Sequence, residues 1–305
     1  MGLLIAILAC LVTSLLHSPE PPAEDALTTQ IEVQPPEARP DQPVAGFATA
    51  GDLLAALERA DRDIRTFSSQ IRYTRLFEIE NDIQTRIGRL YFRTDPPAEV
   101  NSEQPTARRR WVAVRFEQFI AGLRSDKQEK LWVFDGQWLV EKDPVEKQFL
   151  KRRMVRPGQV FDPLRVGEGP FFVPVGQRRE DMELYFTAAL RPSAEGLSDE
   201  YDPKRDQLLK SLAGKLEGLI QLELAPKPGM QQVEDFSLIR IWYDPQTLLP
   251  RASLAVDRLG DVDVFELFAI DINETRAALP EGVFSVDPPA PSEGYHVEIT
   301  DETQE

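Results

Sequence analysis

The chain has 305 residues, 42% of them hydrophobic, which is enough for one large domain or two small ones with a sizeable core. Its net charge of −16 lies mostly at the two ends: residues 19–48 carry −5 and residues 287–305 carry −6, which leaves −5 for residues 49–286. Because a nucleic-acid-binding protein needs a basic face to neutralise phosphates, this distribution argues against nucleic acid as a partner. The short basic runs 108–110 and 151–153 are typical of solvated strand ends.

Residues 1–18 have the pattern of an export signal. Residues 3–16 are almost wholly apolar, and a run of this length is too short for an ordinary membrane span. The only cysteine, Cys10, lies inside this run, where it is either a lipid-attachment site or an apolar residue of a removed segment. We therefore expect a periplasmic protein, tethered to the membrane if the signal is not cleaved, whose mature body has no disulfide.

Composition divides the rest of the chain into three parts. Residues 19–48 contain seven prolines among few large apolar residues, which is typical of an extended, disordered linker. Residues 287–305 are acidic and contain no Lys or Arg, so we predict a C-terminal tail that acts with the linker as a solubilising arm. Residues 49–286 are predicted to form one domain.

The domain is predicted to begin with an amphipathic helix and to continue mainly as strands. Thr49 or Asp52 can cap this helix, in which apolar residues from Leu53 onward recur at helical spacing. A second amphipathic helix is predicted over residues 203–219, and residues 181–190 begin as a helical turn and continue as a strand. Alternating apolar residues predict the remaining strands at 67–79, 86–93, 111–119, 130–134, 137–141, 147–154, 220–225, 236–243, 249–257 and 262–273.

The connections favour an antiparallel sheet. Asp135-Gly136 predicts a tight hairpin between the strands on either side of it. With about ten or eleven strands and short links, the fold class is α+β, and a sheet of this size must curl or close. Residues 166–176 combine glycines and prolines with Phe171 and Phe172, so this loop is predicted to cover an apolar surface. It is either a lid that moves or a static plug that completes the core.

Several motifs resemble the LolA family of periplasmic lipoprotein carriers, which shares its fold with LolB and with the lipid-sensing part of RseB. The resemblance spans residues 50–299 and implies a curled antiparallel sheet that forms an incomplete β-barrel with helices packed in its concave mouth. The motifs are the Gly-x-Leu strand that begins at Gly88 and ends at a proline pair, the Asp-Gly hairpin, the apolar loop at Gly169-Pro-Phe, residues 242–251, and the closing segment 279–289.

This resemblance implies a carrier or chaperone that binds the acyl chains of lipoproteins, or related lipids, in an apolar cavity. Its partners would be the inner- and outer-membrane lipoprotein-handling proteins, and it would act as a monomer without a cofactor. The family's Arg-Pro latch appears here as Arg93-Thr-Asp-Pro, so Arg93 is a candidate lid latch displaced by two positions. An alternative is an envelope sensor or protein-interaction scaffold that uses the same fold without transport.

Apolar side chains are the candidate ligand contacts. Most aromatic residues in strands belong to a core, so the case for these residues is collective: a curled sheet with a lid has more apolar lining than it can fill. The candidate lipid-binding residues are Trp132, Phe134, Trp138, Phe149, Phe171, Phe172, Leu222, Leu224, Trp242 and Phe265.

No catalytic or metal motif is recognisable, so we do not expect an enzyme. The only histidine after the export signal is His296, and one histidine in an acidic tail makes neither a usual zinc site nor a Ser-His-Asp triad. No phosphate-binding or dinucleotide-binding glycine motif is present. Asp261 and Asp263 share one side of a predicted strand, as a glycosidase pair would, but surface solvation explains them better. An enzyme acting on envelope glycans or lipids therefore rests on scattered carboxylates alone.

Overall fold

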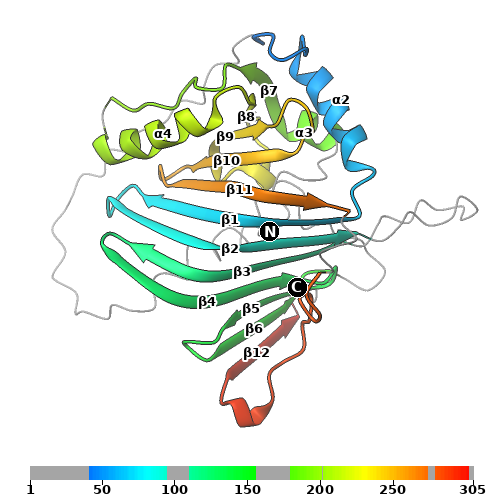
Figure 1. Cartoon of the computed structure of the whole chain (residues 1–305), viewed down its shortest axis with the longest axis vertical. Helices are drawn as coiled ribbons and strands as arrows, with labels where there is room; N and C mark the ends of the chain where they lie inside the picture. The colour runs from blue at the N-terminus through cyan, green and yellow to red at the C-terminus, as the bar shows by residue number, and fades with distance from the viewer. Residues whose placement is uncertain (1–40, 95–109, 156–178, 201, 274–278, 302–305) are drawn as a thin grey trace, which may run out of the picture.

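The computed structural model describes residues 41–94, 110–155, 179–200, 202–273 and 279–301. In these ranges the chain forms a twelve-stranded sheet and three α-helices (Figure 1). The helices are α2 (Ala50–Asp61), α3 (Arg179–Tyr185) and α4 (Pro203–Leu216). The strands are β1 (Thr66–Phe77), β2 (Asp82–Thr94), β3 (Arg110–Ala121), β4 (Arg124–Phe134), β5 (Trp138–Asp143), β6 (Gln148–Arg153), β7 (Phe186–Arg191), β8 (Ile220–Pro226), β9 (Phe236–Tyr243), β10 (Pro250–Asp257), β11 (Val262–Ile272) and β12 (His296–Asp301).

The strands lie side by side in the order β12-β6-β5-β4-β3-β2-β1-β11-β10-β9-β8-β7. Neighbouring strands are antiparallel except β12, which pairs in parallel with β6. In the described chain β7 and β12 stand at the two ends and do not pair with each other, so the sheet curls without closing (Figure 1). The α+β fold with a large, incompletely closed antiparallel sheet, predicted from the sequence, is confirmed.

Local sequence explains where the elements begin. At the start of α2 the Thr49 hydroxyl accepts a hydrogen bond from the backbone N–H of Asp52 at 3.2 Å, and the Asp52 carboxylate accepts one from the N–H of Thr49 at 3.1 Å. Of the two predicted caps, Thr49 is therefore the one that the helix uses. The hairpin between β4 and β5 turns at Gly136, whose φ of 96° is costly for other residues, while Asp135 accepts from the N–H groups of two following residues.

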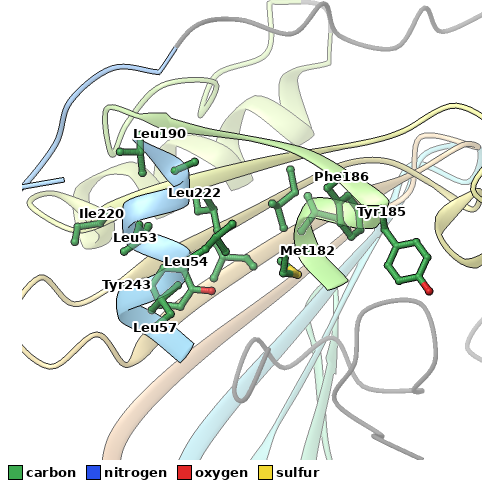
Figure 2. Close-up of a cluster of buried hydrophobic side chains, with 14 of the residues drawn as sticks. Leu53, Leu54, Leu57, Met182, Tyr185, Phe186, Leu190, Ile220, Leu222 and Tyr243 are labelled. Atoms are coloured by element: carbon green, nitrogen blue, oxygen red, sulfur yellow. The ribbon is translucent and has the colours of Figure 1, made fainter. Parts of the chain in front are cut away.

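Helices cover both faces of the sheet. Leu53, Leu54 and Leu57 of α2 and Met182 of α3 pack against strand residues such as Leu222, which defines what we call the α2 face (Figure 2). Helix α4 packs on the opposite face, the α4 face, where its Leu209, Leu212 and Leu216 meet Trp242, Leu254 and Val264. From the sequence we predicted that the helices pack together in one concave mouth of the sheet. For α4 this is wrong, because it packs on the opposite face from α2 and α3. An amphipathic pattern shows that a helix buries one stripe, but not which face of a sheet receives it.

The acidic segment after residue 286, predicted to be a tail, adds strand β12 to the sheet. In the residues that precede strand β12, the side chains of Val283, Phe284 and Tyr295 pack on the α4 face beside Val140 and Phe149. Strand β12 then lies along β6, and an Arg153 Nη1 atom lies 3.4 Å from an Asp301 carboxylate oxygen. The basic run 151–153 thus pairs with an acidic strand, and this charge complementarity explains why two segments predicted to be solvated lie together.

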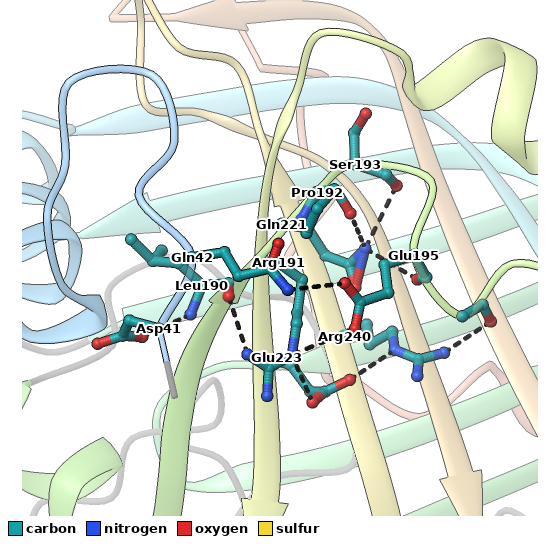
Figure 3. A network of polar contacts seen from close by, with 11 residues as sticks. Asp41, Gln42, Leu190, Arg191, Pro192, Ser193, Glu195, Gln221, Glu223 and Arg240 are labelled. Atoms are coloured by element: carbon teal, nitrogen blue, oxygen red, sulfur yellow. Dashed lines mark hydrogen bonds and ion pairs between the residues drawn. The ribbon is translucent and has the colours of Figure 1, made fainter. Parts of the chain in front are cut away.

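The opposite edge of the sheet is covered by residues that the sequence assigned to the linker. The backbone N–H of Gln42 donates to the Leu190 carbonyl at 3.2 Å, and the Asp41 carboxylate accepts from the N–H of Leu190 at 2.8 Å. Beside this edge, Glu223 accepts from the Nε atoms of Arg191 and Arg240, each at 3.1 Å (Figure 3). This buried network ties β7, β8 and β9 together on the α4 face.

Candidate functional site

Four aromatic rings form a row across the middle of the α2 face. Tyr73 of β1 stacks on Phe265 of β11 with ring centroids 4.6 Å apart, and Phe116 of β3 meets Trp132 of β4 edge-on at 5.1 Å. The centroids of Tyr73 and Phe116 are 6.2 Å apart, which links the two pairs. We call these four residues the aromatic row. They belong to a larger buried cluster that also contains Phe67, Ile71, Leu90, Phe92, Val112, Val114, Phe134, Leu139 and Leu267.

The described helices pack on other parts of the sheet than the aromatic row. Helices α2 and α3 contact β7 near one edge. The described members of the aromatic cluster come from strands, apart from Ile64 and Val155 next to them. Within the described ranges no helix therefore supplies a side chain to this cluster.

Some of the sequence-predicted contact residues lie on this face. Trp132, Phe134 and Phe265 belong to the aromatic cluster. Leu222 and Leu224 lie on the same face but under α2 and α3, in the cluster of Figure 2. Phe171 and Phe172, with the predicted lid at 166–176, lie outside the described residues. The structure therefore brings only part of the predicted set together.

Other predicted contacts lie on the α4 face, with the sheet between them and the aromatic row. Trp242 packs against α4 and its indole N–H donates to the Ser193 carbonyl at 2.8 Å. Phe149 packs against the segment before β12, and Trp138 lies 4.7 Å beneath the Lys151 ammonium. Successive residues of a strand point to opposite faces, so these three side chains lie on the face opposite the aromatic row.

Arg93 also lies on the α4 face. Its guanidinium carbon is 4.3 Å from the ring centroid of Trp111 and 5.2 Å from that of Phe284. It therefore stacks on a residue of the C-terminal segment. Arg93 is predicted to be a lid latch; the predicted lid lies outside the described residues, and among the described ones Arg93 lies over Phe284 of the C-terminal segment.

A charged set borders the aromatic row, and the sequence analysis missed it. Lys130 is 5% exposed, Glu141 6% and Asp143 8%, and all three side chains point to the α2 face. Lys130 Nζ lies 4.0 Å from an Asp143 oxygen, and a Glu141 oxygen lies 3.6 Å from Arg152 Nη1. Burial lowers the pKa of Lys130 and raises the pKa of Glu141. A signal was present, because strand alternation puts Lys130 on the same face as Trp132.

A second polar cluster surrounds Arg75 at the end of the aromatic row. The Arg75 guanidinium lies 2.8 Å from Asp261 and 3.8 Å from Asp263, and the Tyr73 hydroxyl donates to Asp263 at 2.7 Å. Burial raises the pKa of Asp263 to about 6, although Arg75 and the Tyr73 hydrogen bond act in the opposite direction. The prediction that Asp261 and Asp263 are solvated is wrong. Their shared pairing with Arg75 joins β11 to β1 and accounts for both carboxylates without catalysis.

Neither a metal cluster nor a membrane-spanning helix occurs in the part of the chain that the structure describes. Across those ranges no three His, Cys, Asp or Glu side chains are grouped so that they could hold a metal ion. None of the helices in the same ranges is both long enough and apolar enough to span a bilayer.

Comparison with known proteins gives similarity in structure alone. No protein-family model and no curated protein matches the sequence. An uncharacterised conserved protein from Thermus thermophilus matches 83% of this chain and 99% of its own at 11% identity, with a TM-score of 0.40. A LolA superfamily protein from Nitrosomonas europaea matches 78% of this chain and 98% of its own at 10% identity, with a TM-score of 0.31. MucB, in the MucA/MucB complex of Pseudomonas aeruginosa, matches 80% of this chain and 62% of its own at 16% identity, with a TM-score of 0.33.

These matches include the superfamily whose resemblance the sequence motifs indicated. Identities of 10–16% and TM-scores of 0.31–0.40 carry no conclusion about ligand or partner. The functional argument therefore rests on the side chains of this chain.

Proposed function

We propose that this chain is an exported, non-enzymatic binding protein that holds an acyl chain of a lipid or lipoprotein against the aromatic row of the α2 face. The observation that carries the proposal is the row itself: Tyr73, Phe116, Trp132 and Phe265 form a continuous buried apolar cluster, each at most 7% exposed, to which no described helix contributes. An acyl chain gains about 0.8 kcal/mol for each CH₂ removed from water, so about ten methylenes suffice for binding without any charged group.

The proposed setting is the periplasm. Residues 1–18 have the composition of an export signal, and residues 19–40 have that of a spacer. A soluble carrier in this compartment would receive its cargo from an inner-membrane lipoprotein-handling protein and deliver it to an outer-membrane one. We propose that it does so as a monomer and without a cofactor.

Acyl binding is tested with brominated fatty acids, because bromine quenches the fluorescence of a tryptophan that it contacts. The delipidated full chain should bind the probe and lose part of its tryptophan fluorescence. In the Trp132→Leu variant both the affinity and the quenching should fall, the affinity by about tenfold, since an indole face is removed from the contact. Absence of binding to the wild-type chain would overturn the proposal.

Trp242 provides the matched control, since it is also a buried indole but lies on the α4 face. Trp242→Leu should lower the free energy of unfolding and leave acyl affinity unchanged. If the two tryptophan variants weaken binding equally, the effect comes from general loss of stability and the site is not on the aromatic row.

An envelope sensor or scaffold is the second candidate, and one observation favours it. Strand β12 is an edge strand with half-exposed Val297 and Ile299, whereas the other edge is covered by residues 41–42. Unpaired edge strands accept strands from partner proteins. In this case a protein partner is retained after lipid is removed, and is lost when Val297 and Ile299 are both changed to Lys, while acyl binding by the same variant is unchanged.

A further inference from the structure

We infer that Lys130, Glu141 and Asp143, with Arg86 and Arg152, form a head-group site for an anionic amphiphile whose acyl chain lies on the aromatic row. This inference rests on the proposed function and specifies the polar part of the ligand. The anionic group is a carboxylate or a phosphate, since both present the negatively charged oxygens that a buried ammonium and guanidinium groups bind.

Strand pairing places this charged set directly beside the aromatic row. Lys130 of β4 pairs with Phe116 of β3, and Glu141 of β5 pairs with Trp132 of β4. Arg86 of β2 pairs with Tyr73 of β1 in the same way. Because directly opposed residues on antiparallel strands point to the same face, each charge neighbours an aromatic ring. A ligand in contact with the rings therefore has its polar end within reach of the charges.

Lys130 and Glu141 are buried with only long contacts to opposite charges. Within the described residues no hydrogen bond reaches the Lys130 ammonium, and its contact with Asp143 is 4.0 Å long. Glu141 Oε1 lies 3.6 Å from Arg152, and Glu141 Oε2 has no hydrogen-bond partner there. Buried charges are costly unless they are paired and hydrogen-bonded. An anionic oxygen beside Lys130 would replace a long contact with a charge-assisted hydrogen bond of about 2.8 Å.

A network on the α4 face shows what tighter pairing of buried charges looks like in this chain. There, both oxygens of Glu223 accept hydrogen bonds of 3.1 Å, one from Arg191 and one from Arg240 (Figure 3). That network is closed by the chain's own groups, as a structural network should be. Lys130 is similarly buried, but within the described residues its nearest acidic oxygen is 4.0 Å away, so its ammonium can donate a hydrogen bond to an anionic ligand.

The cationic groups of the set are the ones that an anion would contact. Arg86, Lys130 and Arg152 supply three positive charges beside Glu141 and Asp143, and the exposed Glu146 also acts on Lys130 as a negative charge. One Asp143 oxygen accepts from the N–H groups of Val145 and Glu146 at 3.0 Å each, and the other lies 4.0 Å from Lys130 Nζ. The Arg86 guanidinium donates to Gln128 at 3.1 Å and lies over the Phe119 ring, which holds it at the rim of the row.

Three probes with one chain and different heads test the inference: dodecanoate, dodecyl phosphate and dodecanol, each below its critical micelle concentration, by titration calorimetry on the full chain. Both anions should bind at least about tenfold more tightly than dodecanol, as one charge-assisted contact allows. Lys130→Met, which keeps side-chain length without charge, should abolish this preference, and Lys130→Arg should keep it. Lys142→Met is the matched control, because Lys142 of the neighbouring strand β5 lies over Tyr295 on the α4 face.

Each outcome bears on one of the two claims. Equal affinity of the wild-type chain for all three probes overturns the head-group site and leaves acyl binding intact. A preference for anions that survives in Lys130→Met, or that disappears equally in Lys142→Met, also overturns it. If none of the probes binds, the proposed function itself fails. Urea unfolding of each variant shows whether the fold is retained.

Discussion

Glu223 lies at the centre of the buried network of Figure 3, and its removal tests whether burial decides the value of an ion pair. Each of its oxygens accepts from one guanidinium at 3.1 Å, and Arg191 is only 2% exposed. In Glu223→Ala, the buried Arg191 and the partly buried Arg240 lose their shared counter-charge. Arg191 keeps a 3.7 Å contact with Glu195 and a hydrogen bond to the Leu190 carbonyl. Breaking a buried pair costs about 3–5 kcal/mol, and these remaining contacts place the expected loss at about 3 kcal/mol.

The control is a shorter ion pair that is exposed. Arg115 and Glu129 lie 2.9 Å apart, but their side chains are 49% and 45% exposed. Glu129→Ala should therefore cost at most about 0.5 kcal/mol. Urea unfolding at neutral pH gives both free energies, and Glu223→Gln should fall between them because an amide oxygen can serve one arginine. If Glu223→Ala costs no more than Glu129→Ala, the reasoning from burial is refuted.

Three further changes test other parts of the structure. Burial raises the folded-state pKa of Asp263 from 3.8 to about 6, so between these values the native state binds a proton that the unfolded state lacks. The free energy of unfolding should therefore rise by up to about 3 kcal/mol from this group as pH falls from about 7 to 4. Urea unfolding of Asp263→Asn should lack this contribution, and an unchanged pH dependence would contradict it. Gly88→Ala would place a Cβ atom 2.7 Å from the Phe116 Cα atom and closer still to the Arg115 carbonyl oxygen, so calorimetry should show a lower Tm, with a loss of about 2 kcal/mol or more. Thr49→Ala should cost about 1 kcal/mol in urea and Thr49→Ser much less, since serine keeps the cap.

The sequence by itself determined most of the local structure. Alternation of apolar residues placed strands within β8 to β11, and the pattern at residues 181–190 correctly predicted a helical turn followed by a strand. The capping residue of α2 and the Asp135-Gly136 hairpin could also be predicted from the sequence. These features depend on backbone preferences and side-chain period within a few residues, and such information is contained in a short segment. The polar half of β4, from Arg124, was missed because an exposed strand end lacks that period.

Tertiary structure decided which face each side chain occupies and which charges are buried. A β-bulge between Phe116 and Gln118 puts Phe116 and Phe119 on the same face although they are three residues apart, so strand period alone assigns one of them wrongly. Helix α4 covers the face that holds Trp242, and the C-terminal segment covers Phe149, through contacts with residues distant in the chain. Lys130 and Glu141 are buried for the same reason: alternation directs them to a face, but only the packing of the whole sheet removes that face from water.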